Sequence, residues 1–234
     1  MDNDHSLEVN GFSVVDHVLE SRDLYQIAME LDRIGDHEGA RQRNGNIFGV
    51  RNLLDRVPAA RAIIENDSIR ALVKSIAGDG AKPVRSLLFR KSLTANWMVP
   101  WHQDLTIAVR QKRSVAGFGP WTIKAGVTHV QPPISILERI LTIRIHLDGT
   151  DESNGGLKVI PGSHKLGHLS FTAVSDLVTH TKPALCEVSA GGALLMKPLL
   201  LHPSSSCKGP NNRRVLHFEF SADELPGGLE WYGS

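Results

Sequence analysis

The sequence has few cysteines, little net charge and no long apolar run. Only two of its 234 residues are cysteines, Cys186 and Cys207, which is too few for a disulfide framework and predicts a reducing, cytoplasmic location. The formal net charge of +1, without a cluster of Lys and Arg, gives no electrostatic reason to expect nucleic acid. No apolar run approaches the roughly 18 residues of a membrane helix, and the acidic, polar start does not resemble a signal peptide. We therefore expect a small-molecule partner, and the sequence carries no signal of oligomeric state.

The order of patterns along the chain predicts helices first and strands later. Within residues 21–34, apolar residues recur at helical spacing, with Ser21 as a possible N-cap. The same pattern covers residues 57–78, with Pro58 near the start and Gly78 at the end. Later runs are short and β-rich, and Gly, Pro, Asn or Asp separates most of them. This order predicts a mainly β fold with N-terminal helices, a jelly roll with a helical layer on one side.

We expect one domain over residues 1–234, with a helical part at about 1–80 and a jelly-roll core at about 81–222. All-β barrels of this length are often single domains, and the chain is long enough to enclose a pocket. Residues 110–134, which contain Gly, Pro and Trp, have the length and composition of a loop over the mouth of the barrel. Residues 170–180 favour one or two helical turns between strands.

Two expected strands alternate regularly, so each has two distinct faces. In the first strand, the apolar face consists of Leu141, Ile143, Ile145 and Leu147. The polar face of this strand consists of Thr142, Arg144, His146 and Asp148. In the second strand, the two faces are Arg213, Val215, His217 and Glu219; and Arg214, Leu216, Phe218 and Phe220. A polar face either meets water or lines a polar cavity, and the pattern alone leaves this choice open.

The chain contains His-x-Asp twice, and we expect only one copy to bind a metal. His102 and Asp104 precede an apolar run, and His146 and Asp148 repeat their spacing. Residues i and i+2 of a strand project from the same face, so either pair could converge on one ion. His202, which ends a later apolar run, is the candidate third ligand. More plausible strands separate His202 from Asp104 than from Asp148, which favours the first pair in a jelly roll.

Two histidines and one carboxylate form the ligand set of non-haem Fe(II) oxygenases, because they hold one face of an octahedron and leave three positions open. If 2-oxoglutarate fills two of these positions, its far carboxylate needs a cation deep in the pocket. Arg213 lies eleven residues after His202, at the head of the next expected strand, where a hairpin would return it beside the histidine. Arginine offers the two-pronged hydrogen bond that a carboxylate accepts well.

Three segments resemble the phytanoyl-CoA dioxygenase family of Fe(II)/2-oxoglutarate oxygenases. They are LFRKSLTANWMVPWHQDLTIAV, RIHLDGTDESNGGLKVIPGSHKLGHL and LLLHPSSSCKGPNNRRVLHFEFS, and the resemblance covers roughly residues 80–222. Its joint pattern is W-H-Q-D, then N-G-G-L-x-V-I-P-G-S-H, then H-x-S with an Arg eleven residues beyond the His. The family fold is a double-stranded β-helix, a cupin-like jelly roll, which agrees with the strand pattern.

The resemblance implies roles for individual residues. It makes His102, Asp104 and His202 the iron ligands, and Arg213 and Ser204 the partners of the 2-oxoglutarate C5 carboxylate. The further cosubstrate-pocket positions that it implies are Gln103, Trp121 and, as a weaker match, Lys91. The implied cofactors are Fe(II), 2-oxoglutarate as cosubstrate, and O₂.

A departure from the family pattern suggests where the substrate lies. Family members more usually have a small residue near His146. If the polar face of this strand lines the cavity, Arg144 and His146 are substrate contacts and favour a small polar or anionic substrate; the alternative is a polar pair on the outer face. Residues 154–164 are expected to form a turn and a strand, with His164 near the rim of the pocket.

The implied activity is hydroxylation of an unactivated C–H bond of a small metabolite, with release of succinate and CO₂. Asp104 favours hydroxylation, because related halogenases replace this carboxylate by a small residue, although desaturation uses the same ligands. Two alternatives remain: a cupin-like metal-binding protein without oxygenase activity, and a nucleic-acid demethylase on the same fold. The missing H-x-H spacing disfavours the first alternative, and the neutral charge disfavours the second.

Overall fold

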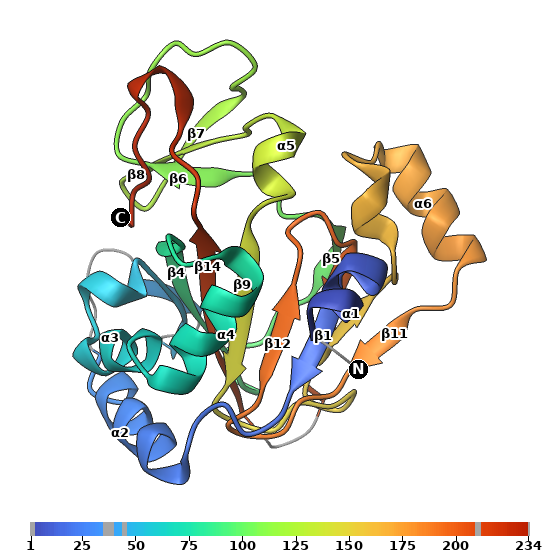
Figure 1. The fold of residues 1–234 in the computed structure, drawn as a ribbon. Coiled ribbons are helices and arrows are strands. Elements are labelled where there is room, and N and C mark those ends of the chain that lie inside the picture. The colour runs from blue at the N-terminus through green and yellow to red at the C-terminus, as the bar shows by residue number, and fades with distance from the viewer. Residues whose placement is uncertain (1–2, 35–39, 44–45, 209–211, 234) are drawn as a thin grey trace.

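A computed structural model shows two antiparallel sheets that face each other, with helices outside the larger sheet (Figure 1). The structure describes residues 3–34, 40–43, 46–208 and 212–233. The predicted single domain of residues 1–234 includes residues outside these ranges, so it stays a prediction. Within the described ranges, no helix is long and apolar enough to cross a membrane.

The larger sheet has seven strands, and the smaller sheet has four. In spatial order, the larger sheet consists of β1 (Phe12–Val15), β12 (Ala193–Met196), β9 (Leu141–His146), β14 (Arg213–Ser221), β4 (Lys82–Lys91), β3 (Asn46–Arg51) and β2 (Ala40–Arg43). The smaller sheet consists of β11 (Ala184–Cys186), β10 (Leu157–Val159), β13 (His202–Ser204) and β5 (Val99–His102). All these neighbours pair antiparallel, and most are distant in sequence. This is the predicted jelly roll.

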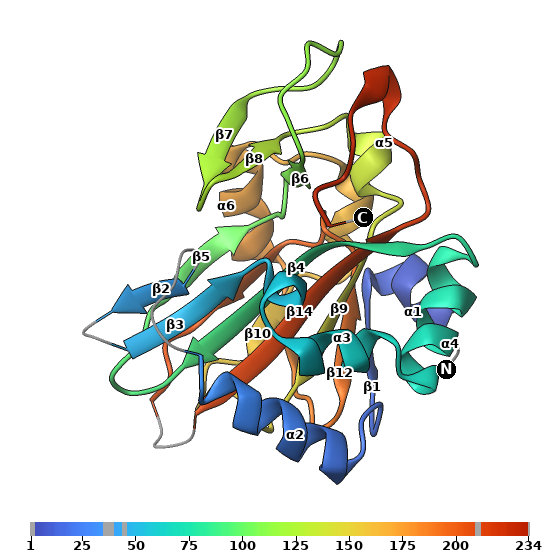
Figure 2. The same ribbon diagram turned by 90° about the vertical axis from the view of Figure 1, so that its left-hand side faces the viewer.

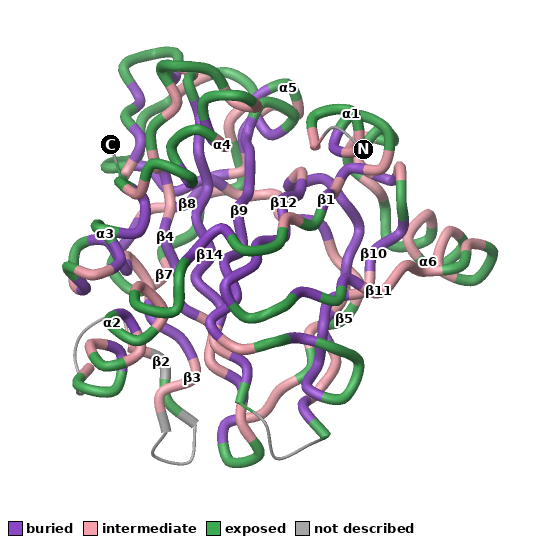
Figure 3. Tube along the Cα trace, turned by 60° about the horizontal axis from the view of Figure 1, so that its bottom comes forward, coloured by how far each residue is buried: buried purple, intermediate pink, exposed green. Residues whose placement is uncertain are grey.

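The central strands β9 and β14 are buried on both faces. Ile143 and Phe218 belong to the apolar core between the larger sheet and the helices. Arg144, Arg213 and His217 lie on the opposite faces and line a cavity between the two sheets. Figure 3 shows these strands as buried segments inside exposed loops. The alternation of the sequence therefore predicted both faces, and the polar faces of these two strands turn toward the cavity.

Three helices cover the outer face of the larger sheet: α2 (Ser21–Leu31), α3 (Pro58–Ile64) and α4 (Asp67–Ala77) (Figures 1 and 2). Their buried apolar residues join those of the sheet in one cluster. Both helical segments were predicted, with two differences in detail. Ser21 is the first helical residue and Glu20 occupies the N-cap position. The second segment divides at Asn66, whose side chain accepts a hydrogen bond from the Ser68 N–H at 2.9 Å and caps α4.

The first 80 residues also supply three strands that the sequence did not predict. After α1 (Asn3–Asn10), strand β1 pairs with β12 at one edge of the larger sheet, and β2 and β3 pair antiparallel at the other edge. These strands are only four to six residues long. Pairing with distant strands stabilises β1 and β3, and β2 pairs with β3; periodicity within a short window does not detect pairing with distant segments.

Residues 110–134 are not the loop that their composition suggested. They contain a hairpin of β7 (Trp121–Lys124) and β8 (Val127–Val130), which pairs with β6 (Ile107–Val109) in a third sheet at one end of the larger sheet (Figures 1 and 2). Ala125 and Gly126 have φ angles of 50° and 77°, as a tight two-residue hairpin turn requires. The strands are too short for their alternation to stand out beside the flanking Gly and Pro residues.

The remaining elements are short, apart from α6. They are η1 (Leu53–Asp55), α5 (Ile134–Leu137), η2 (Ser163–Leu166) and η3 (Pro226–Gly228). Helix α6 (Phe171–His180) forms where helical turns were predicted, and Ser170 caps it by accepting a hydrogen bond from the Ala173 N–H at 3.2 Å. It lies on the side of the smaller sheet and buries none of its residues (Figure 1).

Candidate metal centre

Three side chains converge at the ends of strands β5 and β13. His102 and His202 are direct cross-strand partners, with ring centroids 4.2 Å apart. Asp104 follows β5, and its Oδ2 lies 3.9 Å from Nε2 of His202. One ligand atom from each residue lies within 4.8 Å of the other two. The structure thus brings together the three residues predicted as ligands, although they span 100 positions of sequence.

Each histidine is oriented by its own strand. Nδ1 of His102 lies 2.8 Å from the carbonyl oxygen of Pro100, and Nδ1 of His202 lies 2.8 Å from that of Leu200. Because a carbonyl oxygen only accepts, each Nδ1 carries the proton and donates. Each Nε2 therefore keeps a lone pair for a metal, as is usual for metal-binding histidines.

The electrostatic state of the site suits a cation. Burial, and then the proximity of His102, lower the pKa of His202 to about 4, so this imidazole is neutral at pH 7. Burial by itself would raise the pKa of Asp104, but in the acid range, where His202 and His217 are protonated, these two residues and Arg85 outweigh it and hold this pKa well below its usual range. A neutral imidazole and an ionised carboxylate are the forms that coordinate metals.

The donor set fits Fe(II). Two imidazole nitrogens and one carboxylate form the facial triad of non-haem iron enzymes. Asp104 also lies within 4.8 Å of the ligand atoms of His217 and Glu219. In that second set, however, Oε1 of Glu219 already binds Nη1 of Arg85 at 2.9 Å and Nε2 of His217 at 3.1 Å. His102, Asp104 and His202 are therefore the better ligand set.

A second cluster, deeper between the sheets, is built for an anion. The Lys91 ammonium donates to Oγ of Ser204 and to the carbonyl oxygen of Ser205, both at 2.6 Å. Nη2 of Arg213 donates to the same Ser204 Oγ at 3.2 Å, and its Nη1 donates to the Gly155 carbonyl oxygen. Two cations thus meet on one hydroxyl group, and among the described residues neither forms an ion pair.

Burial makes this pair of cations costly unless an anion binds. Burial, and then the charges of Arg213 and Arg144, lower the pKa of Lys91 to about 7. Burial, and then Arg144, lower the pKa of Arg213 to about 9. Nε of Arg213 is buried without a hydrogen-bond partner in the described structure. A bound carboxylate would compensate both charges and supply acceptors for their N–H groups.

The metal ligands and the anion cluster line one cavity of about 260 Å³. The predicted site residues on its wall are His102, Asp104, His202, Ser204, Arg213 and Arg144. Lys91 contacts the wall through Ser204. The wall also contains residues that the sequence did not single out as site residues, among them Arg85, Phe89 and His217. In the sequence these residues alternate with core residues, and this alternation could have identified them. Their position opposite the metal ligands, however, depends on how the two sheets pack against each other.

Gln103 and Trp121 lie away from this cavity. Nε2 of Gln103 donates to the carbonyl oxygens of Gly167 and Leu199, at 2.8 and 2.7 Å, and its Oε1 accepts from the Leu169 N–H at 2.9 Å. Trp121 packs against the apolar cluster beside the third sheet. The structure therefore does not bring either residue to the cosubstrate cluster.

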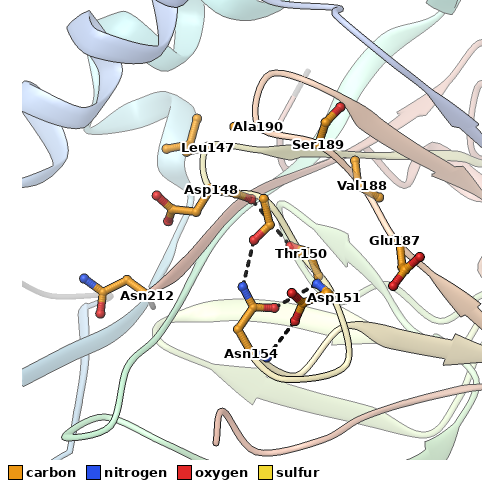
Figure 4. A pocket seen from close by; sticks show the side chains of 11 residues that line it. Leu147, Asp148, Thr150, Asp151, Asn154, Glu187, Val188, Ser189, Ala190 and Asn212 are labelled. Carbon is orange, nitrogen blue, oxygen red and sulfur yellow. Dashed lines mark hydrogen bonds between the residues drawn. The ribbon is translucent and has the colours of Figure 1, made fainter. Parts of the chain in front are cut away.

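The second His-x-Asp pair does not converge. Nδ1 of His146 lies 2.6 Å from Oγ1 of Thr150. Asp148 binds Arg214, with Nε–Oδ2 at 3.0 Å and Nη2–Oδ1 at 2.8 Å. Asp148 and Thr150 line a wide polar hollow of about 880 Å³, in which Asn154 donates to the Gly149 carbonyl oxygen (Figure 4). His146 lines neither this hollow nor the metal cavity.

The segment 154–164 supports the site through its backbone. Gly155 has a φ of 82°, a Cβ there would collide with the Ser205 carbonyl oxygen, and its own carbonyl oxygen binds Arg213. Oγ of Ser163 accepts from the Leu201 N–H at 2.9 Å, next to His202. His164 is not at the pocket rim, because its ring packs against Gly11 and its Nε2 lies 3.2 Å from the Glu8 carbonyl oxygen.

The structure is similar to several solved structures. AviO1 from Streptomyces viridochromogenes Tue57 matches with a TM-score of 0.69 at 19% identity, over 96% of this chain and 94% of that chain. EctD from S. alaskensis, solved with bound Fe, gives a TM-score of 0.71 at 16% identity, over 93% of this chain and 74% of that one. SnoN, a non-haem α-ketoglutarate-dependent epimerase from nogalamycin biosynthesis, gives 0.68 at 15% identity, over 97% and 89%. These likenesses establish the fold, and no curated protein matches the sequence.

The fold and the ligand set together define a non-haem iron, 2-oxoglutarate-dependent oxygenase. The family model described as Phytanoyl-CoA dioxygenase (PhyH) matches residues 7–215, and the chain belongs to this family. The predicted resemblance, the jelly-roll fold class, and an enzyme that uses Fe(II) and 2-oxoglutarate are thereby confirmed.

Proposed function

We propose that this protein hydroxylates an unactivated C–H bond of a small, polar or anionic metabolite and releases succinate and CO₂. The observation that carries this proposal is the convergence of His102, Asp104 and His202 on the cavity that also contains Arg213. Bound iron and 2-oxoglutarate supply the activation of O₂ and the oxidation of the C–H bond. The side chains of the protein bind, orient and exclude water.

Each part of the cavity has a separate task in this proposal. His102, Asp104 and His202 hold the metal. Arg213, Lys91 and Ser204 bind the C5 carboxylate of the cosubstrate, so that its other end reaches the metal. The retained carboxylate of Asp104 supports hydroxylation, because it occupies the position that halogenases free for chloride.

The charge of the cavity wall supports an anionic or polar substrate. Four arginines line the cavity, at positions 51, 85, 144 and 213, and Asp104 is the carboxylate among the lining residues. Arg144 is the predicted substrate contact that lies on the wall. His146, the other predicted contact, is not among the lining residues; its Nδ1 lies 2.6 Å from Oγ1 of Thr150.

We also infer the reducing, cytoplasmic location that the cysteine content suggested. Cys186 and Cys207 are both free thiols and both buried. Burial raises the pKa of Cys186 to about 12, so this thiol is protonated and unreactive at neutral pH.

The test of the function is turnover of 2-oxoglutarate. Protein supplied with Fe(II), ascorbate and O₂ should convert 2-oxoglutarate to succinate slowly by itself and faster with a true substrate from a library of small acids and polar metabolites. Asp104→Ala should abolish both reactions, and Arg139→Met, at the exposed ion pair with Asp223, should change neither. If the wild-type protein forms no succinate and binds no Fe(II), the proposed function is wrong.

A further inference from the structure

Four side chains form a continuous polar chain along the cavity wall. Nη1 of Arg144 lies 3.0 Å from Nδ1 of His217. Nε2 of His217 lies 3.1 Å from Oε1 of Glu219, which also accepts from Nη1 of Arg85 at 2.9 Å. Strands β9, β14 and β4 carry these residues on adjacent positions, because His217 pairs with Arg144 and Glu219 pairs with Arg85.

The direction of these hydrogen bonds follows from the chemistry of the groups. A guanidinium group only donates, so Nδ1 of His217 must accept from Arg144. The proton of the neutral ring is then on Nε2, which donates to the carboxylate of Glu219. Arg85 donates to the same Oε1 of Glu219 and stabilises the charge of that carboxylate. Glu219 and His217 together therefore fix the orientation of Arg144.

Among the residues that the structure describes, Arg144 forms no ion pair of its own. It is 6% exposed, its guanidinium carbon lies 5.3 Å from the Phe89 ring centroid, and its buried Nε has no hydrogen-bond partner in the described structure. Burial lowers the pKa of the Arg144 guanidinium, and the carboxylate of Asp104, which interacts with it electrostatically, raises that pKa by less. Asp104, however, belongs to the metal site. A buried guanidinium without a counter-charge is costly, and an arriving carboxylate would offset that cost.

We propose that Arg144, held in place by His217 and Glu219, is a second carboxylate-binding group in this cavity, separate from the cluster of Arg213, Lys91 and Ser204. This inference rests on the proposed function. The carboxylate has two possible sources: the metal-side carboxylate of 2-oxoglutarate, or a carboxylate of the substrate. Arg144 binds the anion, and His217 and Glu219 are positioning residues.

The first experiment measures binding to the anaerobic, Fe(II)-loaded protein by calorimetry. The probes are 2-oxoglutarate and 2-oxobutyrate, which has the same metal-binding end and lacks the C5 carboxylate. If Arg144 binds the metal-side carboxylate, Arg144→Met should weaken both probes by the same factor, about tenfold or more. Arg213→Met should weaken 2-oxoglutarate alone, and the surface variant Arg139→Met should weaken neither.

The second experiment measures the melting temperature of the Fe(II)- and 2-oxoglutarate-loaded protein with small carboxylic acids and with their primary amides. If Arg144 binds a substrate carboxylate, acids should stabilise the wild-type protein more than the matched amides. Arg144→Met should lose this difference and keep wild-type affinity for 2-oxoglutarate. Wild-type behaviour of Arg144→Met in both experiments would overturn the inference.

The positioning role has its own test, in whichever experiment responds to Arg144→Met. His217→Phe removes the acceptor for Arg144 and should weaken carboxylate binding about threefold to tenfold. His217→Gln should restore it, because an amide can accept from Arg144 and donate to Glu219. A residue that only fills space would show no such rescue. Equal carboxylate affinities of the wild-type protein, His217→Phe and His217→Gln would refute the positioning role of His217.

The failure of the proposed function and the failure of this inference give different results. If the wild-type protein binds neither Fe(II) nor 2-oxoglutarate, the proposed function fails. If it binds both and Arg144→Met changes nothing, only this inference fails.

Discussion

His102 faces His202 directly across the pairing of β5 and β13, with ring centroids 4.2 Å apart and ring planes inclined at 50°. His146, which has the same sequence spacing to an aspartate, contacts Thr150 and is not among the residues that line the metal cavity. The two histidines therefore make a matched pair for testing which His-x-Asp binds the metal.

His102→Ala should reduce Fe(II) affinity at least about 100-fold, because changes even outside the ligand shell cost roughly 10- to 100-fold. His146→Ala should leave Fe(II) affinity within about twofold. Anaerobic competition with a chromogenic Fe(II) chelator measures both. A loss of affinity in His146→Ala with normal binding in His102→Ala would contradict the assignment of the ligands.

Arg213→Met should weaken 2-oxoglutarate binding by about 30-fold or more, the usual effect of removing one partner from a buried, hydrogen-bonded charge pair. The neighbouring Arg214 points the other way, to Asp148. Arg214→Met is thus a control of equal chemistry, and it should leave 2-oxoglutarate affinity unchanged. Anaerobic calorimetry distinguishes the two, and an equal loss in both variants would count against a specific carboxylate site at Arg213.

The binding of 2-oxoglutarate should take up a proton above pH 7. Lys91 has a pKa of about 7 in the free protein, where the groups whose charges act on it are Arg213, Arg144 and Cys207. Above pH 7 it is mostly neutral, and a bound carboxylate restores the charged form and raises its pKa. Affinity should therefore fall as pH rises above 7, by at most about tenfold per unit, and be level below 7.

Calorimetry at pH 8 in two buffers with different ionisation enthalpies measures this proton uptake. The apparent binding enthalpies should differ between the buffers for the wild-type protein and agree for Lys91→Met. Equal enthalpies for the wild-type protein would show that Lys91 is already charged before the ligand binds.

Gly155→Ala should destabilise the protein more than Gly78→Ala, although both glycines have a φ near 85° (82° and 88°). A Cβ at Gly78 meets no atom within 4 Å, so that variant shows only the cost of its backbone conformation, with a ψ of 164°, which is about 1–3 kcal/mol. At Gly155 the Cβ would meet the Ser205 carbonyl oxygen, and the carbonyl oxygen that binds Arg213 would have to move. Urea unfolding should give a lower free energy of unfolding for Gly155→Ala than for Gly78→Ala, and only Gly155→Ala should weaken 2-oxoglutarate binding. Equal free energies of unfolding would show that the segment around Gly155 accommodates the Cβ without a cost in stability.

The sequence predicted the candidate ligand pair and the residues that share each face of the central strands because both depend on local spacing, and it left open which way the polar faces turn. The period of two in a strand placed His102 and Asp104 together, and it separated Arg213 from Arg214. The same period puts Gln103 on the opposite face from its neighbours, where its amide joins β5 to the segment around Gly167. Family resemblance had assigned Gln103 to the pocket against this alternation.

The parts that escaped prediction depend on pairing between distant segments. The chain from Arg144 to Arg85 exists only because β9, β14 and β4 are neighbours in a particular register. Likewise, the short strands β1 and β3 pair with β12 and β4, which lie far away in sequence. Periodicity shows which face of a segment is polar, and register decides which polar groups meet.

The hydrogen bonds from His102 to Pro100 and from His202 to Leu200 make the orientation of both rings depend on the chain itself. Each ring is held by a carbonyl two residues earlier in the same chain segment, and this contact needs no ion. In a zinc finger, by contrast, the metal organises the chain, and its removal unfolds the domain. Here chelation should give a folded apoprotein that can be reloaded with different divalent ions.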